Sequence, residues 1–214
     1  MTAPAALASW HHDYPGKLAG SLYAVAPGQR IATARAMAEA GLDIHLDVMA
    51  AAEGLPAGVS PTELAGITET VGPAVADVHL IGSPDFVDAT LPGVLAHRPG
   101  KVFLPWAAFT DHRAAQIRDA GSAAWITLWQ EWNGITTPHW PAAVDGVLVM
   151  LIEPGTRGRC RLDRLAIVAA CAAELPVIVD GGVTEDIAPL CLTAGVASMV
   201  VGRALLPSSG KEAT

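Results

Sequence analysis

The sequence predicts an α/β fold in which eight parallel strands alternate with helices and close into a (β/α)8 barrel. Three observations predict it. The chain has 214 residues, and such a barrel occupies ~200 to 250 residues as one domain. Short apolar runs alternate with helical patterns, and no linker-like tract interrupts them. No GxGxxG motif follows the first run, which disfavours an open doubly wound sheet. We expect one domain over residues 1–214, with residues 1–17 as an N-terminal extension.

The elements follow in chain order. Candidate strands span residues 19–25, 42–49, 75–82, 101–106, 123–129, 145–152, 176–182 and 197–202. Helical patterns lie between them, for example over residues 30–41, 60–72, 110–121 and 161–175, and several end at a glycine in the C′ position. After the last strand only a short tail remains, so we expect a truncated eighth helix. Residues 1–17 or a partner subunit would then cover that sector.

Composition narrows the setting. A formal net charge of −8 opposes non-specific binding to nucleic acid. No apolar run reaches membrane-spanning length, and the first residues lack a basic segment followed by a long apolar one. The three cysteines, Cys160, Cys171 and Cys191, form no CxxC pair, which argues against a disulfide framework and a thiolate zinc site. We expect a cytoplasmic protein that binds neither nucleic acid nor membranes.

Charged residues recur inside the second strand. In the stretch GLDIHLDVMA, the residues Asp43, His45 and Asp47 occupy every second position, so an extended chain places all three on one face. Charges in a protein interior are costly unless they are paired or bind a metal. The pattern therefore indicates a buried polar network or a site.

Four such residues come near the carboxyl ends of predicted strands: His45, Asp47, His79 and Asp180. The loops at those ends carry the active sites of such barrels. Two imidazoles and two carboxylates suit one divalent ion, namely zinc, iron(II) or manganese(II). Any one of them alone would as readily be a satisfied polar group of the core, but four together favour a metal site.

Several segments resemble the ribulose-phosphate 3-epimerase family. They are IHLDVM, DVHL, VLVMLIEPG, VIVDGGV and VVGRALL, and the similarity runs from Ser21 to about Leu205. The resemblance implies a TIM barrel of the ribulose-phosphate-binding type, with a divalent metal held by His45, Asp47, His79 and Asp180. It also implies that the two aspartates move protons, and it places Ser21, Met49, His79 and Met150 around the substrate.

The chemistry of a 3-epimerase fits this set of residues. Inverting a carbon beside a ketone requires two acid/base groups on opposite sides of the substrate, and Asp47 and Asp180 come from different strands. The intermediate is a cis-enediolate, whose charge a metal ion stabilises. Met49 and Met150 would form polarisable walls over it, or would be ordinary core residues.

Glycines follow the last three strands. Gly155, Gly158, Gly181, Gly182 and Gly202 form our candidate phosphate cradle, because their backbone N–H groups can approach an anion closely. Each glycine alone would more often mark a turn. Arg157, Arg159 and Arg203 differ from the family pattern, and they either contact the phosphate or are solvated.

Other segments also depart from the family. An apolar stretch beginning at Ala50 replaces the loop that lines the non-phosphate end of the substrate, and Ile81 stands where a methionine is common. These changes leave open a ribulose or xylulose 5-phosphate, or a hexulose 6-phosphate such as fructose or allulose 6-phosphate. Trp106, Trp129 and Trp132 lie near the rim, where they either shape the pocket or cap the core.

The leading hypothesis is a metal-dependent ketose-phosphate 3-epimerase, acting as a homo-oligomer. The alternative of a different class is a catalytically silent phosphosugar-binding barrel. A third hypothesis is an isomerase that needs no metal ion. Presence of all four candidate ligands favours the first.

Overall fold

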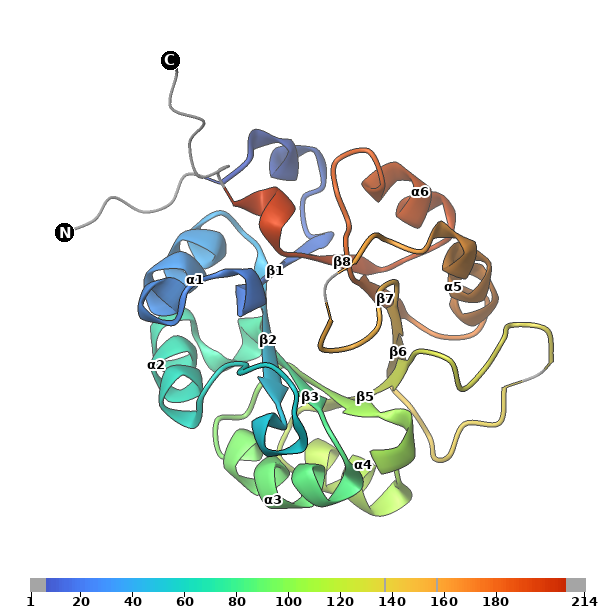
Figure 1. Ribbon diagram of the computed structural model, residues 1–214, viewed down its shortest axis with the longest axis horizontal. Coiled ribbons are helices and arrows are strands. Elements are labelled where there is room, and N and C mark those ends of the chain that lie inside the picture. Colours follow the sequence, from blue (N-terminus) through green and yellow to red (C-terminus); the bar gives the residue numbers. More distant parts are fainter. Residues whose placement is uncertain (1–6, 137, 157, 207–214) are drawn as a thin grey trace.

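The computed structural model describes residues 7–136, 138–156 and 158–206, and it confirms the (β/α)8 barrel. Each strand pairs in parallel with the next one along the chain, and β8 pairs with β1 to close the ring (Figure 1). The strands are β1 (Leu18–Ser21), β2 (Asp43–Met49), β3 (Ala76–Ile81), β4 (Lys101–Pro105), β5 (Ala123–Leu128), β6 (Gly146–Met150), β7 (Val177–Asp180) and β8 (Ser198–Val201).

Helices surround this ring on the outside (Figure 1). They are α1 (Arg30–Glu39), α2 (Pro61–Val71), α3 (Pro84–Leu95), α4 (Asp111–Asp119), α5 (Leu165–Ala172) and α6 (Ala188–Thr193). The four helical patterns read from the sequence contain α1, α2, α4 and α5. Helix α2 begins with a capping box, in which Ser60 and Glu63 satisfy each other's backbone N–H groups. Gly41 and Gly121 follow α1 and α4 with φ of 78° and 87°, as expected for C′ glycines.

The apolar residues form two cores. The larger one lies between the strands and the helices. The smaller one fills the barrel itself and consists of Ala19, Phe103, Trp125, Leu148, Met150, Ile178 and Val200. The large Trp125 ring fits here because its neighbour on β6 is Gly146, where a Cβ would lie 2.5 Å from that ring. The barrel is therefore a packed layer of side chains that supports whatever lies at its mouth.

Several predicted boundaries differ from the observed ones by one to four residues, and local turns explain three of these differences. Strand β1 ends at Ser21, because the Ser21 hydroxyl accepts a hydrogen bond from the Tyr23 N–H and the chain turns into a 3₁₀ helix. Strand β7 ends at Asp180, since Gly181 and Gly182 have φ of 115° and 69°. Helix α5 begins at Leu165, after a separate 3₁₀ turn.

The connection from β5 to β6 differs from the others. Its described residues, 129–136 and 138–145, contain no helix, and in Figure 1 this connection extends away from the barrel. The Trp140 ring lies 5.5 Å from that of Trp106 and 6.1 Å from that of Trp132. These three indoles pack against the larger core, where a crossover helix would otherwise lie.

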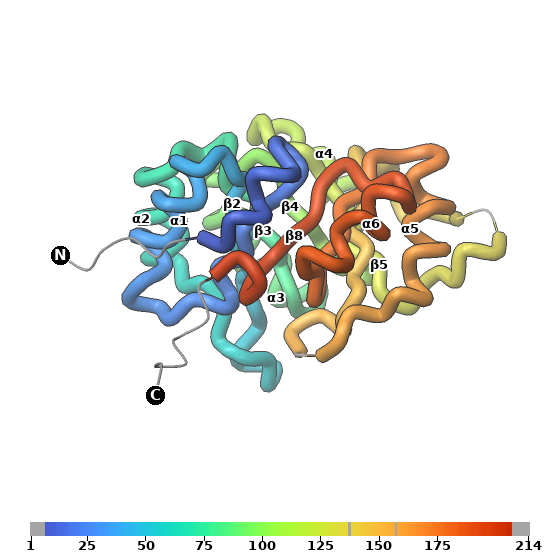
Figure 2. Tube along the Cα trace, turned by 90° about the horizontal axis from the view of Figure 1, so that it is seen from above, coloured from blue at the N-terminus to red at the C-terminus, as the bar shows by residue number. Residues whose placement is uncertain are grey.

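The two described ends of the chain lie together (Figure 2). After β8 the chain forms only a short 3₁₀ turn, Arg203–Leu205. The Ala8 N–H donates to the Leu205 carbonyl at 3.0 Å, and the Trp10 indole N–H donates to the Ala204 carbonyl at 3.1 Å. The N-terminal segment thus covers the sector of the short last turn. Residues 1–6 and 207–214, within the predicted extension and tail, lie outside the described part. No helix in the described part is long and apolar enough to cross a membrane.

Candidate metal centre and active site

The four residues singled out from the sequence meet at the carboxyl ends of their strands. His45 and Asp47 lie on β2, His79 on β3 and Asp180 at the end of β7. The register of the barrel pairs Asp47 with His79 directly across β2 and β3. One potential ligand atom from each of the four lies within 4.8 Å of all the others. These residues could hold a metal ion, as the sequence predicts.

The contacts within this cluster fit a cation. His45 Nε2 lies 3.3 Å from Asp47 Oδ1 and 3.8 Å from Asp180 Oδ2, and His79 Nδ1 lies 3.2 Å from Asp47 Oδ1. His45 is only 1% exposed, yet neither of its ring nitrogens has a hydrogen-bond partner among the described residues. A buried imidazole without a partner that faces two carboxylates is the arrangement a divalent ion would complete.

The electrostatics of the cluster separate its two carboxyl groups. Burial raises the pKa of Asp180 to about 7, and the nearby charge of Asp47 contributes. Burial also acts on Asp47, but His45 and His79 beside it hold its pKa well below the usual range. For His45, burial lowers the pKa, but the carboxylates outweigh it and raise the pKa to about 9. At neutral pH the metal-free cluster thus contains a protonated His45, an ionised Asp47 and a partly protonated Asp180.

Other residues hold these groups in place. The Ser21 hydroxyl donates to Asp47 Oδ2 at 3.3 Å. His79 Nε2 lies 3.2 Å from Thr127 Oγ1, so the ring is fixed through the nitrogen that does not face the carboxylates. The Phe103 ring, 5.5 Å from that of His45, forms an apolar floor. Thr127 was not among the residues predicted from the sequence, although alternation along β5 places the side chains of Thr127 and Trp125 on one face.

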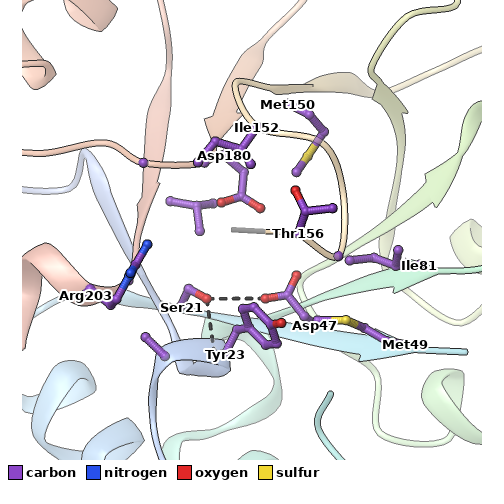
Figure 3. A pocket seen from close by; sticks show the side chains of 16 residues that line it. Ser21, Tyr23, Asp47, Met49, Ile81, Met150, Ile152, Thr156, Asp180 and Arg203 are labelled. Carbon is purple, nitrogen blue, oxygen red and sulfur yellow. Dashed lines mark hydrogen bonds between the residues drawn. The ribbon is translucent and has the colours of Figure 1, made fainter. Parts of the chain in front are cut away.

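A cavity of about 200 Å³ opens above this cluster. Asp47 and Asp180 project into it from opposite sides (Figure 3). Most of the substrate-binding residues predicted from the sequence line it: Ser21, Met49, Met150, Gly155, Gly181, Gly182, Gly202 and Arg203. His79 lines an adjacent hollow instead. Tyr23 and Thr156 also line the main cavity, and nothing in the sequence pattern had singled them out.

The glycines of the β7 and β8 loops bring backbone close to this cavity. A Cβ on Gly182 would lie 3.0 Å from the backbone nitrogen of Cys160, and one on Gly181 would lie 2.7 Å from that of Ile152. Both positions therefore require glycine. Gly158 is exposed and does not line the main cavity. Arg159 and Arg203 are exposed, and Arg157 lies outside the described residues.

The loops after β2 and β6 lie on the same side of the barrel (Figure 2). Leu55 Cδ2, in the first loop, is 3.2 Å from where a Cβ on Gly155 would lie in the second. Glu53 fixes the first loop by accepting hydrogen bonds from the Ser83 N–H and hydroxyl at 2.9 and 2.6 Å. Residues 50–58, beginning at Ala50, line neither the main cavity nor the adjacent hollow.

Comparison with known proteins places the chain in a family. Residues 17–206 match the ribulose-phosphate 3-epimerase family. A comparison with curated proteins finds no significant match. Among solved structures, phosphoribosyl anthranilate isomerase from Thermus thermophilus superposes with a TM-score of 0.59, 16% identity and 88% coverage of both chains. Tryptophan synthase from Mycobacterium tuberculosis gives a TM-score of 0.61 and 18% identity, covering 92% of this chain and 86% of the other. At these identities the structures show the shared fold alone.

Proposed function

The chain belongs to the ribulose-phosphate 3-epimerase family, and we propose that it is a metal-dependent 3-epimerase of a ketose phosphate. The observation that carries the proposal is the position of Asp47 and Asp180 on opposite sides of one cavity (Figure 3). Inverting a carbon beside a ketone requires a base on one face and an acid on the other. One carboxyl group on each face meets that requirement.

The proton transfers follow from these positions. In one direction, Asp47 takes the proton from C3, and the electron pair left behind moves toward the C2 carbonyl to give a cis-enediolate. Asp180 then donates its proton to the other face of C3, which forms the epimer. In the reverse direction the two residues exchange roles.

One divalent ion would be held by His45, Asp47, His79 and Asp180, and it would stabilise the negative charge of the enediolate as a Lewis acid. The donor set suits zinc, iron(II) or manganese(II). The surrounding residues orient these groups. Thr127 fixes the His79 ring and Ser21 holds the Asp47 carboxylate. Met49 and Met150 line the cavity and would exclude water from the bound substrate.

The phosphate would bind at the loops after β6, β7 and β8. Gly155, Gly181, Gly182 and Gly202 line the cavity there, and Arg203 adds a positive charge to a chain whose net charge is −8. Backbone N–H groups bind an anion without requiring a global positive field. Gly158, in the same loop as Gly155, is also predicted for this cradle, although it does not line the cavity.

Both a pentulose 5-phosphate (ribulose or xylulose) and a hexulose 6-phosphate (fructose or allulose) meet these requirements. We expect the protein to act in the cytoplasm as a homo-oligomer, with no nucleic-acid or membrane partner. These expectations stand on composition and on the family.

The test is to incubate metal-loaded protein with each of these ketose phosphates and follow the C3 epimer by NMR. We expect conversion of at least one of them, and at least a tenfold lower kcat/KM for the dephosphorylated sugar, because remote phosphate binding is lost. Binding of every ketose phosphate without conversion would instead identify a catalytically silent phosphosugar-binding barrel. Full conversion by chelator-treated protein would contradict the metal requirement.

A further inference from the structure

A second hollow opens beside the main cavity. Its volume is about 150 Å³, and its lining includes Trp106, Trp129 and Glu131. Trp106 follows β4, and the other two follow β5. His79 and Thr127 also line it. Trp106, Trp129 and Glu131 have no role in the proposed proton transfers or in the predicted phosphate cradle.

Most of the residues that line this hollow come from β3, β4 and β5 or directly follow these strands, and Pro154, in the loop after β6, completes the lining. In a closed ring of eight strands, β3 and β4 are opposite β7 and β8. Gly181, Gly182 and Gly202 line the main cavity on the β7 and β8 side. Ile81 lines both spaces, and His79 contributes to the metal cluster while lining the hollow. The metal cluster therefore lies between the phosphate side and the hollow.

This order fixes which end of the substrate faces the hollow. If the C2 and C3 oxygens of a ketose phosphate lie over the cluster, carbons from C4 onward run toward the glycine loops. The C1 side then points toward β3–β5. The additional carbon of a hexulose 6-phosphate lies on the phosphate side of C3, so it would not enter the hollow. Assuming about 30 Å³ for each water molecule, the hollow has room for about five of them. A C1 hydroxyl alone leaves most of it empty.

The walls of the hollow are held in place. The guanidinium carbon of Arg164 lies 4.6 Å from the centre of the Trp129 ring. Arg164 itself is buried, and it donates to the backbone carbonyls of Met150 and Leu128. The Glu131 carboxylate accepts a hydrogen bond from the backbone N–H of Trp129 at 2.7 Å. The Trp106 ring lies against that of Trp140. Fixed indoles and a carboxylate suit an apolar or hydroxyl-bearing group and disfavour an acidic one.

We propose that the hollow lined by Trp106, Trp129 and Glu131 binds an uncharged substituent on the C1 side of the substrate. The preferred ligand class is then ketose phosphates extended at C1, and Trp106 is a specificity-determining residue. This proposal rests on the proposed epimerase function for the direction in which the substrate lies. The proposal concerns the end of the substrate that lies away from Gly181, Gly182 and Gly202.

The experiment compares ribulose 5-phosphate with its 1-O-methyl and 1-O-benzyl ethers, using metal-loaded protein. We expect at least one ether to have a higher kcat/KM than ribulose 5-phosphate, because the hollow adds binding energy. Trp106→Ala should lower the ether-to-parent ratio of kcat/KM at least tenfold. Trp132→Ala is the matched control, since Trp132 lies in the same aromatic cluster but does not line the hollow. Glu131→Ala, at an exposed position, serves if Trp106→Ala does not fold.

Turnover of ribulose 5-phosphate with at least tenfold lower kcat/KM for both ethers would overturn the hollow proposal and leave the epimerase function intact. If no ketose phosphate reacts, the epimerase function fails, and calorimetry decides about the hollow. Tighter binding of an ether than of ribulose 5-phosphate, lost in Trp106→Ala and kept in Trp132→Ala, would support it. Equal or weaker binding of both ethers would overturn it.

Discussion

The charged residues at the two ends of strand β2 have different partners. Asp43 and Asp77 lie near the amino ends of β2 and β3, and Lys101 is the first residue of β4. Lys101 Nζ lies 2.8 Å from Asp77 Oδ2 and 3.7 Å from Asp43 Oδ2. This is the lower cluster. At the carboxyl ends lie the four residues of the metal cluster, and among the described residues no lysine or arginine pairs with its carboxylates. The lower cluster contains a lysine as its cation, whereas the four residues of the metal cluster could hold a divalent ion.

Strand β2 thus contributes residues both to the stability of the fold and to the candidate metal site. Burial raises the pKa of Asp77, and Lys101 counteracts that rise, so the lower cluster is a partly buried ion pair. In the metal cluster, the unpartnered nitrogens of His45 face two carboxylates. Residues at the amino ends of barrel strands typically stabilise the fold, and those at the carboxyl ends carry the chemistry. Substitutions at the two ends should therefore affect different properties.

The largest effect should come from the catalytic carboxyl groups. Asp47→Asn or Asp180→Asn removes proton transfer on one face of C3, so epimerisation should fall by the ~10² to 10⁴-fold typical of general acid/base catalysis. The rate is measured by NMR with metal restored and metal content checked, because both residues are also predicted ligands. Wild-type rates in either variant would remove that residue from the mechanism.

The lower cluster should affect stability instead. Lys101→Met leaves Asp77 buried without its cation. Breaking a fully buried pair costs about 3 to 5 kcal/mol, and this partly buried pair should cost less than that. Urea denaturation should report that loss in the free energy of unfolding, while metal content stays unchanged. Lys17→Met is the matched control at an exposed position, and it should change stability by less than about 0.5 kcal/mol. Loss of metal in Lys101→Met would show that the two clusters are not independent.

A smaller effect is expected from the contact between Thr127 and His79. Thr127→Val keeps the shape but removes the hydroxyl beside His79 Nε2, and losing such a partner typically weakens metal affinity ~10 to 100-fold. Competition with a chromogenic chelator measures that affinity. Thr127→Ser should recover most of it. An unchanged affinity in Thr127→Val would mean that packing alone orients the His79 ring.

Metal binding should release protons. In the metal-free protein the pKa of His45 is about 9 and that of Asp180 is about 7, and both groups must be deprotonated to act as ligands. Affinity should therefore fall as pH falls, by about tenfold per pH unit between pH 9 and 7 and more steeply below pH 7. Calorimetry in buffers of different ionisation enthalpy counts the protons. An affinity independent of pH from 6 to 9 would place the ion elsewhere.

The smallest effect should come from Asp43. Its side chain is 45% exposed and lies 3.7 Å from Lys101, so Asp43→Asn should cost less than about 1 kcal/mol of stability. Activity should stay within twofold of the wild type. If Asp43→Asn abolished turnover while Asp47→Asn did not, the functional site would lie at the other end of the barrel.

The metal cluster could be predicted from the sequence because its geometry depends on strands. Alternation along a strand places His45 and Asp47 on one face, and the order of strands in a closed barrel brings His79 and Asp180 to the same rim. Loop geometry does not enter this argument. The rim location of Trp106 and Trp129 follows from the same reasoning.

Other features depend on contacts that the sequence pattern does not encode. In the sequence, Thr127 looks like any other residue of a strand. It contacts His79, 48 positions away, only because of the register of the barrel. The end of β1 depends on one side-chain hydrogen bond at Ser21. The helix-free connection after β5 is packed by Trp132 and Trp140. The sequence assigns Trp132 equally well to the pocket or to the core, and it does not single out Trp140.

Deuterium exchange at C3 of both epimers of the substrate in D2O, with metal restored, tests most directly whether Asp47 and Asp180 act from opposite faces. The wild-type protein should exchange the C3 proton of both epimers. Asp47→Asn should exchange it in only one epimer without inverting the carbon, and Asp180→Asn should exchange it only in the other. The same preference in both variants, or no exchange by the wild-type protein in any ketose phosphate that it binds, would contradict this mechanism.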